Sequence, residues 1–286
     1  MSKKYYNLAE LAYPDIQEFL KESDVIMIPF GSCEMHGKHL PNGTDSYQCT
    51  AITRRTAEIA NVPYTDTLMY GYSPHHIRDV EQGIGTVTLR AETLNAVLYD
   101  IGRSVIHHGF NKLIFVCGHA SNMKVTDSVL RRLRYETGAM VGQVRPWAER
   151  YLGLIEPFME GGPEDTPGWH AGEFETSQML AYDSDLVRMD RAEVGKAHAP
   201  DWLPKEFKKD DGLPSVALDG YEYFSFMMEH GEFAPLGIMG NPLVGTKEKG
   251  EKCIEAYAQH MAKALNLLKP IPWKDKITQR EFVNRV

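Results

Sequence analysis

The chain alternates between short apolar runs and longer stretches with helical spacing. The clearest apolar runs are Val25–Phe30 and Lys112–Cys117, each followed by a glycine, and weaker ones lie at Thr86–Leu89 and Ala139–Val144. Short apolar runs bounded by turn residues are typical of buried strands. We therefore expect these four segments to be strands.

Helical spacing fills the intervals between these runs. The predicted helices are Ser46–Ala60, Ala91–His108, Asn122–Thr137 and Glu248–Leu268. Strands that alternate with helices of this length are typical of βαβ units, so they predict an α/β fold with a mainly parallel central sheet. The 286 residues fit one large domain, which we expect to span residues 1–286.

Two long segments show no regular pattern. Residues 150–170 and 198–235 are rich in proline, glycine and aromatic residues. We expect long ordered loops there, which act as lids or subunit contacts or are ordinary surface excursions.

Composition narrows the class of protein. A hydrophobic fraction of 43% supports a sizeable core, and a net charge of −8 disfavours nucleic acid or an anionic membrane as a partner. The chain has no apolar run long enough for a membrane span and no apolar leader, and its four cysteines include no CxxC pair. We expect a cytoplasmic protein that acts on a small molecule.

Residues that could bind a metal follow the first predicted strand, in the segment GSCEMHGKHLPNGTD. Glu34 and His36 are two residues apart, so in an extended segment their side chains point to the same side. Asp45 follows a Pro-Asn-Gly turn that can fold the chain back. Two carboxylates and an imidazole suit zinc, manganese or iron.

Two further segments offer ligands to the same site. His119 follows the second clear strand, and the carboxyl ends of neighbouring parallel strands meet at one edge. The segment WHAGEFETS carries His170, Glu173 and Glu175. The two glutamates point to the same side in an extended chain but diverge by about 200° in a helix, where only one could reach the site. Together these residues could hold two metals that share a carboxylate.

Other residues are candidates for weaker roles. Ser73 and His76 lie in a Tyr-Ser-Pro-His-His segment and are candidates for substrate contacts, although loop histidines often have no such role. Cys33 stands beside Glu34, but no basic partner or helix N-terminus is evident that would activate it, so a buried thiol is the favoured interpretation.

Four motifs resemble those of the creatininase (creatinine amidohydrolase) family. They are PFGSCEMHGKHLPNGTD, GHASN, HAGEFETS and GIMGNPLVGTKEKG, and the resemblance spans about Val25 to Leu268. It implies a three-layer α/β/α fold, a centre of one or two divalent ions (zinc or manganese, with iron as an option), and a homo-oligomer, typically a hexamer.

The resemblance also implies roles for individual residues. Glu34, Asp45 and His119 would hold one metal, His36 and Asp45 the other, and His170 would handle a proton. Creatininase itself carries a glutamate where this chain has Ser121, so one ligand of the second metal is either missing or supplied by Glu173 or Glu175. We assign Glu175 to the metal and Glu173 to proton transfer.

The surroundings of Trp169 differ from the tryptophan-bearing creatinine pocket of the family. We expect Trp169 and Ser121 to contact the substrate, and the substrate to differ from creatinine.

The main hypothesis is metal-dependent hydrolysis of a small cyclic or amide carbonyl compound by C–N cleavage. In it an activated water attacks the carbonyl, Glu173 accepts the proton and His170 delivers it to the leaving atom. Two alternatives remain open. The first is C–C ring opening of a cyclic polyol ketone such as 3-dehydro-scyllo-inosose, and the second is a metal- or ligand-binding protein without catalysis.

Overall fold

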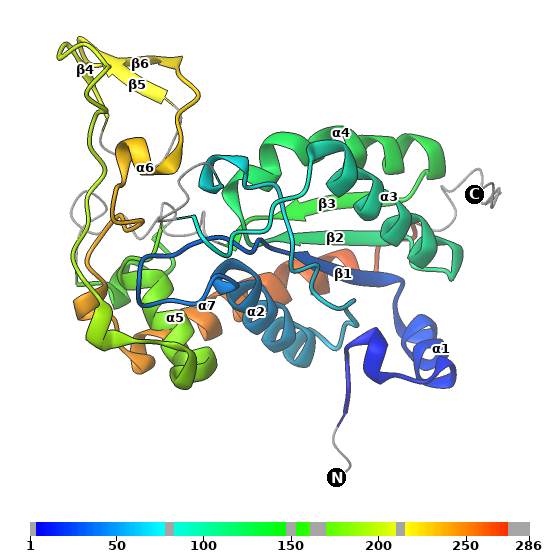
Figure 1. Ribbon diagram of the computed structural model, residues 1–286. Coiled ribbons are helices and arrows are strands. Elements are labelled where there is room, and N and C mark those ends of the chain that lie inside the picture. The colour runs from blue at the N-terminus through cyan, green and yellow to red at the C-terminus, as the bar shows by residue number, and fades with distance from the viewer. Residues whose placement is uncertain (1–3, 78–82, 147–152, 161–169, 210–214, 274–286) are drawn as a thin grey trace.

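A parallel sheet forms the centre of the molecule. The computed structural model describes residues 4–77, 83–146, 153–160, 170–209 and 215–273. Within them β1 (Val25–Phe30), β2 (Lys112–Cys117) and β3 (Met140–Val144) pair in the order β1-β2-β3 (Figure 1). Phe30 pairs with Cys117, so β1 and β2 end at the same edge of the sheet. The α/β fold expected from the sequence is confirmed.

Helices cover both faces of this sheet, which gives three layers (Figure 1). Alternate residues of β1 point to opposite faces: Ile26 and Ile28 join one core cluster, whereas Val25 and Met27 join another. The first cluster is completed by α3 (Ala91–His107) and α4 (Ala120–Thr137), and the second by α2 (Thr44–Ala60) and α7 (Lys247–Leu268). These helices confirm the predicted ones to within two residues at each end.

Two shorter helices complete the body. Helix α5 (Glu173–Asp183) packs against α7 and α2, and α1 (Tyr13–Glu22) precedes β1. Single 3-10 turns lie at Leu8–Glu10, Pro74–His76, Glu156–Phe158, Ser184–Leu186, Met189–Arg191 and Pro242–Val244.

One predicted strand is wrong. Thr86–Leu89 joins no sheet of the described chain; Val87 forms only an isolated bridge with Cys33. This segment runs beyond the ends of the strands, where the Val87 N–H donates to the Cys33 carbonyl and the Thr86 hydroxyl accepts from the Met35 N–H. It braces the loop after β1 instead of extending the sheet.

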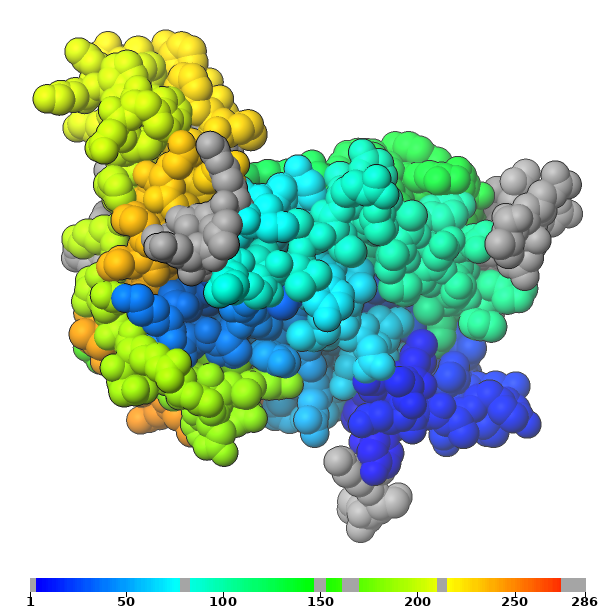
Figure 2. Space-filling model, viewed as in Figure 1, coloured from blue at the N-terminus to red at the C-terminus, as the bar shows by residue number. Residues whose placement is uncertain are grey.

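The segment 198–235 is not the long loop that its composition predicts. It contains β4 (Phe207–Lys208), β5 (Ser215–Leu218) and β6 (Tyr221–Ser225), which form an antiparallel sheet, followed by α6 (His230–Phe233). Asp219 and Gly220 both adopt positive φ between β5 and β6, as a two-residue hairpin turn requires. The small sheet projects from the body, while α6 lies at its base (Figures 1 and 2).

The segment 150–170 is described only in part. Residues 153–160 include the 3-10 turn Glu156–Phe158, and residues 161–169 lie outside the described chain. Among the described helices, none combines the length and the apolar character needed to cross a membrane.

Candidate metal centre

Five ligand-type side chains converge beyond the carboxyl ends of β1 and β2. Glu34 and His36 lie in the loop after β1, Asp45 in the first turn of α2, His119 directly before α4, and Glu175 in the first turn of α5. None exposes more than 6% of its surface. Burying three carboxylates together is costly unless cations or hydrogen bonds compensate them.

Two glycines let these segments approach one another. A Cβ on Gly118 would lie 2.5 Å from the Asp45 carbonyl oxygen, and a Cβ on Gly31 would clash with Ser46. The first turn of α2 therefore packs directly against the ends of both strands. This position also places the Asp45 carboxylate at a helix N-terminus, where negative charge is stabilised.

The first group of donors surrounds His119. Its Nδ1 lies 2.9 Å from Asp45 Oδ2, and its Nε2 lies 3.3 Å from Glu34 Oε2. One donor atom each from Glu34, Asp45 and His119 lies within 4.8 Å of the others.

The second group surrounds His36. Its Nε2 lies 3.3 Å from Asp45 Oδ1 and 3.4 Å from Glu175 Oε2. Asp45 thus presents Oδ2 to one group and Oδ1 to the other. A carboxylate in this position can bridge two cations.

Neighbouring groups hold these ligands in orientation. The Ser32 hydroxyl donates to Asp45 Oδ2 at 2.6 Å, and the Ala171 N–H donates to Glu175 Oε2 at 2.6 Å. His36 Nδ1 lies 3.0 Å from the Glu34 carbonyl, to which it can donate, and this leaves Nε2 for a metal. Such a contact from the second ring nitrogen is a regular feature of metal-ligating histidines.

The charges of the centre perturb one another strongly. Burial lowers the pKa of His36, but the Asp45 and Glu175 carboxylates outweigh it and raise the pKa to about 10. Burial raises the pKa of Glu175 to about 8 and also raises the pKa of Glu34. Burial opposes ionisation of Asp45 too, but His36 and His119 hold its pKa well below the ordinary value.

The donor set fits a divalent cation. Glu34 Oε2 and His36 Nε2 are buried and have no hydrogen-bond partner among the described residues. Carboxylate oxygens and imidazole nitrogens at this spacing match the preferences of zinc and manganese. A cation at each group would neutralise the buried carboxylates and satisfy these atoms.

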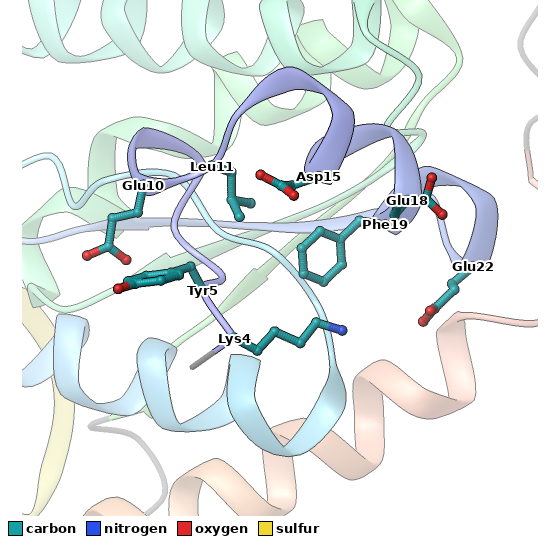
Figure 3. A pocket seen from close by; sticks show the side chains of 8 residues that line it. All are labelled: Lys4, Tyr5, Glu10, Leu11, Asp15, Glu18, Phe19 and Glu22. Carbon is teal, nitrogen blue, oxygen red and sulfur yellow. The ribbon is translucent and has the colours of Figure 1, made fainter. Parts of the chain in front are cut away.

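A different pocket lies near the amino end of β1, between α1 and the N-terminal segment (Figures 1 and 3). Its volume is about 390 Å³, and its lining carries carboxylates together with Lys4, whose ammonium lies 4.9 Å from the Phe19 ring centre. No histidine is present among its described lining residues, so it does not share the chemistry of the five-ligand cluster.

The sequence of this chain matches a known protein family. The creatininase family, described as creatinine amidohydrolase, matches residues 9–265. The chain belongs to the creatininase family.

Three relatives of this family member have different substrates in their names. A creatinine amidohydrolase of Pseudomonas putida is 28% identical over 93% of this chain and 97% of that protein. A 3-dehydro-scyllo-inosose hydrolase of Thermotoga maritima is 26% identical over 87% and 78%. A mycofactocin precursor peptide peptidase of Mycobacterium ulcerans is 30% identical over 79% and 78%.

Solved creatininase structures have the same fold and contain metals. Creatininase in a manganese form superposes with a TM-score of 0.71 at 28% identity, covering 93% of this chain and all of that one. A mutant creatininase of Zn-Zn type gives a TM-score of 0.72 at 28% identity, covering 94% and 100%. With its buried ligand cluster, this chain is a metal-dependent hydrolase that uses divalent metal.

The structure brings Glu34, His36, Asp45, His119 and Glu175 together, as the sequence predicts, but it does not bring Glu173 to them. Glu173 is fully buried on another side of α5, where its carboxylate lies 2.5 Å from Lys249 Nζ and accepts from the Glu160 N–H. Because the segment is helical, the two glutamates diverge. The expected role of Glu173 as proton acceptor is therefore contradicted by its position.

The other predicted site residues differ in how close they lie to the centre. His170 and His76 are buried beside the centre, at 3.9 Å and 3.3 Å from Glu34 Oε1. Ser73 Oγ lies 3.2 Å from His119 Nε2. Ser121 is buried in the first turn of α4, and Trp169 lies outside the described residues.

The sequence analysis missed His230. This residue opens α6, in the segment expected to be loop, and its ring lies 4.4 Å from that of His170 and 4.3 Å from that of His76. A histidine in a Pro- and Gly-rich segment carries no spacing signal. The fold alone brings it to the site.

Proposed function

We propose that this hydrolase cleaves the C–N bond of a small cyclic or linear amide with two divalent cations, zinc or manganese, as its cofactors. One would be held by Glu34, Asp45 and His119, and the other by His36, Asp45 and Glu175. The observation that carries this proposal is the placement of Asp45, whose two carboxylate oxygens face separate ligand groups.

When bound, such a pair of cations lowers the pKa of a water toward about 7 and polarises a carbonyl. The protein contributes the geometry: Asp45 between the two groups, and neighbouring donors that fix Asp45 and Glu175. Burial of all five ligands keeps bulk water away and so strengthens electrostatic interactions in the site.

His170 is the side chain best placed to move a proton. Its Nε2 lies 2.6 Å from the Met35 carbonyl, to which it donates, so the lone pair is at Nδ1 on the side of Glu34. Burial, reinforced by His36, holds the pKa of His170 well below the ordinary value. The neutral ring takes up a proton from the attacking water at Nδ1 and returns it to the leaving nitrogen.

A second candidate is C–C ring opening of a cyclic polyol ketone. It is favoured by His76, whose buried ring is kept neutral by burial and by His230, and whose Nδ1 has no partner among the described residues. A neutral imidazole can bond a substrate hydroxyl. The relative named as an inosose hydrolase supports this candidate.

We further propose that Ser73, His76, Ser121 and Trp169 line the substrate pocket. We also propose that the chain forms one domain over residues 1–286, is cytoplasmic, and assembles as a homo-oligomer, as a hexamer by resemblance to its family.

A substrate panel tests this function. Zinc- or manganese-loaded protein is incubated with creatinine, other cyclic amides, short peptides and inososes, and products are identified by mass spectrometry. We expect amide hydrolysis that a chelator abolishes and added metal restores. Turnover of inososes alone would replace the main candidate by the second one, and turnover that survives the chelator would contradict both.

A further inference from the structure

Three histidines form a separate cluster beside the binuclear centre. His76 lies in a 3-10 turn, His170 precedes α5 and His230 opens α6. Each exposes 4% of its surface, and one ring nitrogen of each lies within 4.8 Å of the others. Their ring centres are 4.3 Å (His76–His230), 4.4 Å (His170–His230) and 5.0 Å (His76–His170) apart.

Three of the six ring nitrogens in this cluster have no hydrogen-bond partner among the described residues. Both ring nitrogens of His230 and Nδ1 of His76 are buried without a hydrogen bond to any described residue. The rings do not satisfy one another, because His76 and His230 stack within 30° and N–H groups lie in the ring planes. Buried polar atoms without partners are rare and costly, so these nitrogens point to a ligand.

The remaining nitrogens have the partners that metal-ligating histidines usually have. His170 Nε2 donates to the Met35 carbonyl, and His76 Nε2 lies 3.3 Å from a Glu34 carboxylate oxygen. A carbonyl or carboxylate behind one ring nitrogen fixes the tautomer and presents the lone pair of the other nitrogen. His76 and His170 are thus set to offer Nδ1.

We propose that His76, His170 and His230 bind a third divalent cation, zinc, and that its binding inhibits the enzyme. Three imidazoles form a nitrogen-only donor set, which suits zinc and does not suit magnesium or calcium. The inhibitory part rests on the proposed function, since a cation on the cluster would occupy the His170 lone pair that moves the proton.

His230 makes the site testable without disturbing the binuclear centre. It lies in the 198–235 segment, apart from the other two histidines in the sequence, and its ring nitrogens form no hydrogen bond to any ligand of the binuclear centre. His260, an exposed histidine on α7, provides the matched control.

The test compares wild type, His230→Ala and His260→Ala. Each protein is dialysed against the same free Zn²⁺ concentration, the lowest at which zinc binding to wild type is saturated, and bound zinc per chain is measured by mass spectrometry. We expect His230→Ala to hold one zinc fewer than the other two proteins. Loss of this ligand should weaken the third site by at least about tenfold, the smallest effect usual even for residues that only support a ligand.

Equal zinc content in the three proteins would overturn the proposal. If His230→Ala does not fold, the test uses anomalous X-ray diffraction from zinc in crystals of the wild-type protein. A zinc peak among the three rings would support the site, and the absence of a peak there would overturn it. These readouts need no substrate, so a failed activity panel leaves them intact. Once a substrate is known, excess zinc should inhibit wild type more strongly than His230→Ala, and equal inhibition would contradict the inhibitory role.

Discussion

Two glutamates at the start of α5 stand two residues apart, yet they have opposite surroundings. Glu175 faces His36 and the metal centre, whereas Glu173 pairs with Lys249 on α7. Their chemistry is identical, so the direction of each side chain on the helix decides its role. This pair provides a matched experiment at the scale of single residues.

The substitution Glu175→Gln should remove one ligand of the second metal position. We expect about one equivalent less of bound metal per chain and a large loss of turnover, because removing a ligand exceeds the usual ten- to hundred-fold effect of a supporting residue. Metal content after dialysis checks the first result. An unchanged content would exclude Glu175 from the centre.

The control Glu173→Gln should show the reverse pattern. It should keep the metal but lower the free energy of unfolding by about 1–3 kcal/mol, because Lys249 loses a buried charged partner. Urea denaturation measures the loss. A stability equal to that of wild type, or loss of metal, would contradict the assigned role.

The sequence predicts most of the residues of the centre but not the division between these glutamates. Glu34, His36, Asp45 and His119 are predictable because they follow strands whose ends must meet. Glu173 and Glu175 could be separated only by knowing that α5 begins at Glu173, and Ser32 could be identified only through its bond to Asp45. Both depend on the folded structure, so a local sequence pattern cannot predict them.

At the scale of elements, the site depends on how closely α2 approaches the ends of β1 and β2. Gly118 lies at this contact, against the backbone of Asp45. Gly142 on β3 is a suitable comparison, since an added Cβ there would meet only Ile114 Cδ1 at 3.4 Å.

We expect Gly118→Ala to destabilise the protein by about 1–3 kcal/mol, as overpacking does, and to weaken metal binding because Asp45 must shift. Gly142→Ala should change stability by less than about 0.5 kcal/mol, as substitutions away from special features do. Denaturant unfolding and metal titration of both variants measure these effects. Equal behaviour of the two variants would argue against a close approach at Gly118.

Elements were predictable where hydrophobic pattern and burial agree. β1 and β2 are buried along their whole length, and their apolar runs identify both strands at the correct bounds. The β5–β6 hairpin was missed because β6 is exposed at every position. A strand with no buried side needs no regular pattern of apolar residues, so its sequence does not identify it. The prediction for Thr86–Leu89 was wrong for the opposite reason: its residues have a strand-like pattern, but the segment hydrogen-bonds to a loop and not to a sheet.

At the scale of the molecule, the centre is assembled from segments far apart in the sequence. Glu34, His119 and Glu175 follow or begin different elements, and helices from both sides of the sheet contribute. A site that exists only in the folded chain couples metal binding to stability.

Metal removal should therefore lower the melting temperature of the protein. A cation at one hundred times its dissociation constant stabilises the folded state by about 2.7 kcal/mol per site. Thermal unfolding of chelator-treated protein, with and without added Mn²⁺, measures the shift. Identical melting curves would show that the ligand cluster binds no metal in the folded state.

Anomalous X-ray diffraction from crystals grown with Mn²⁺ tests the central claim most directly. The account predicts one manganese peak among Glu34, Asp45 and His119 and a second among His36, Asp45 and Glu175, with Asp45 between them. Crystals with saturating Mn²⁺ and no peak at either position would contradict it.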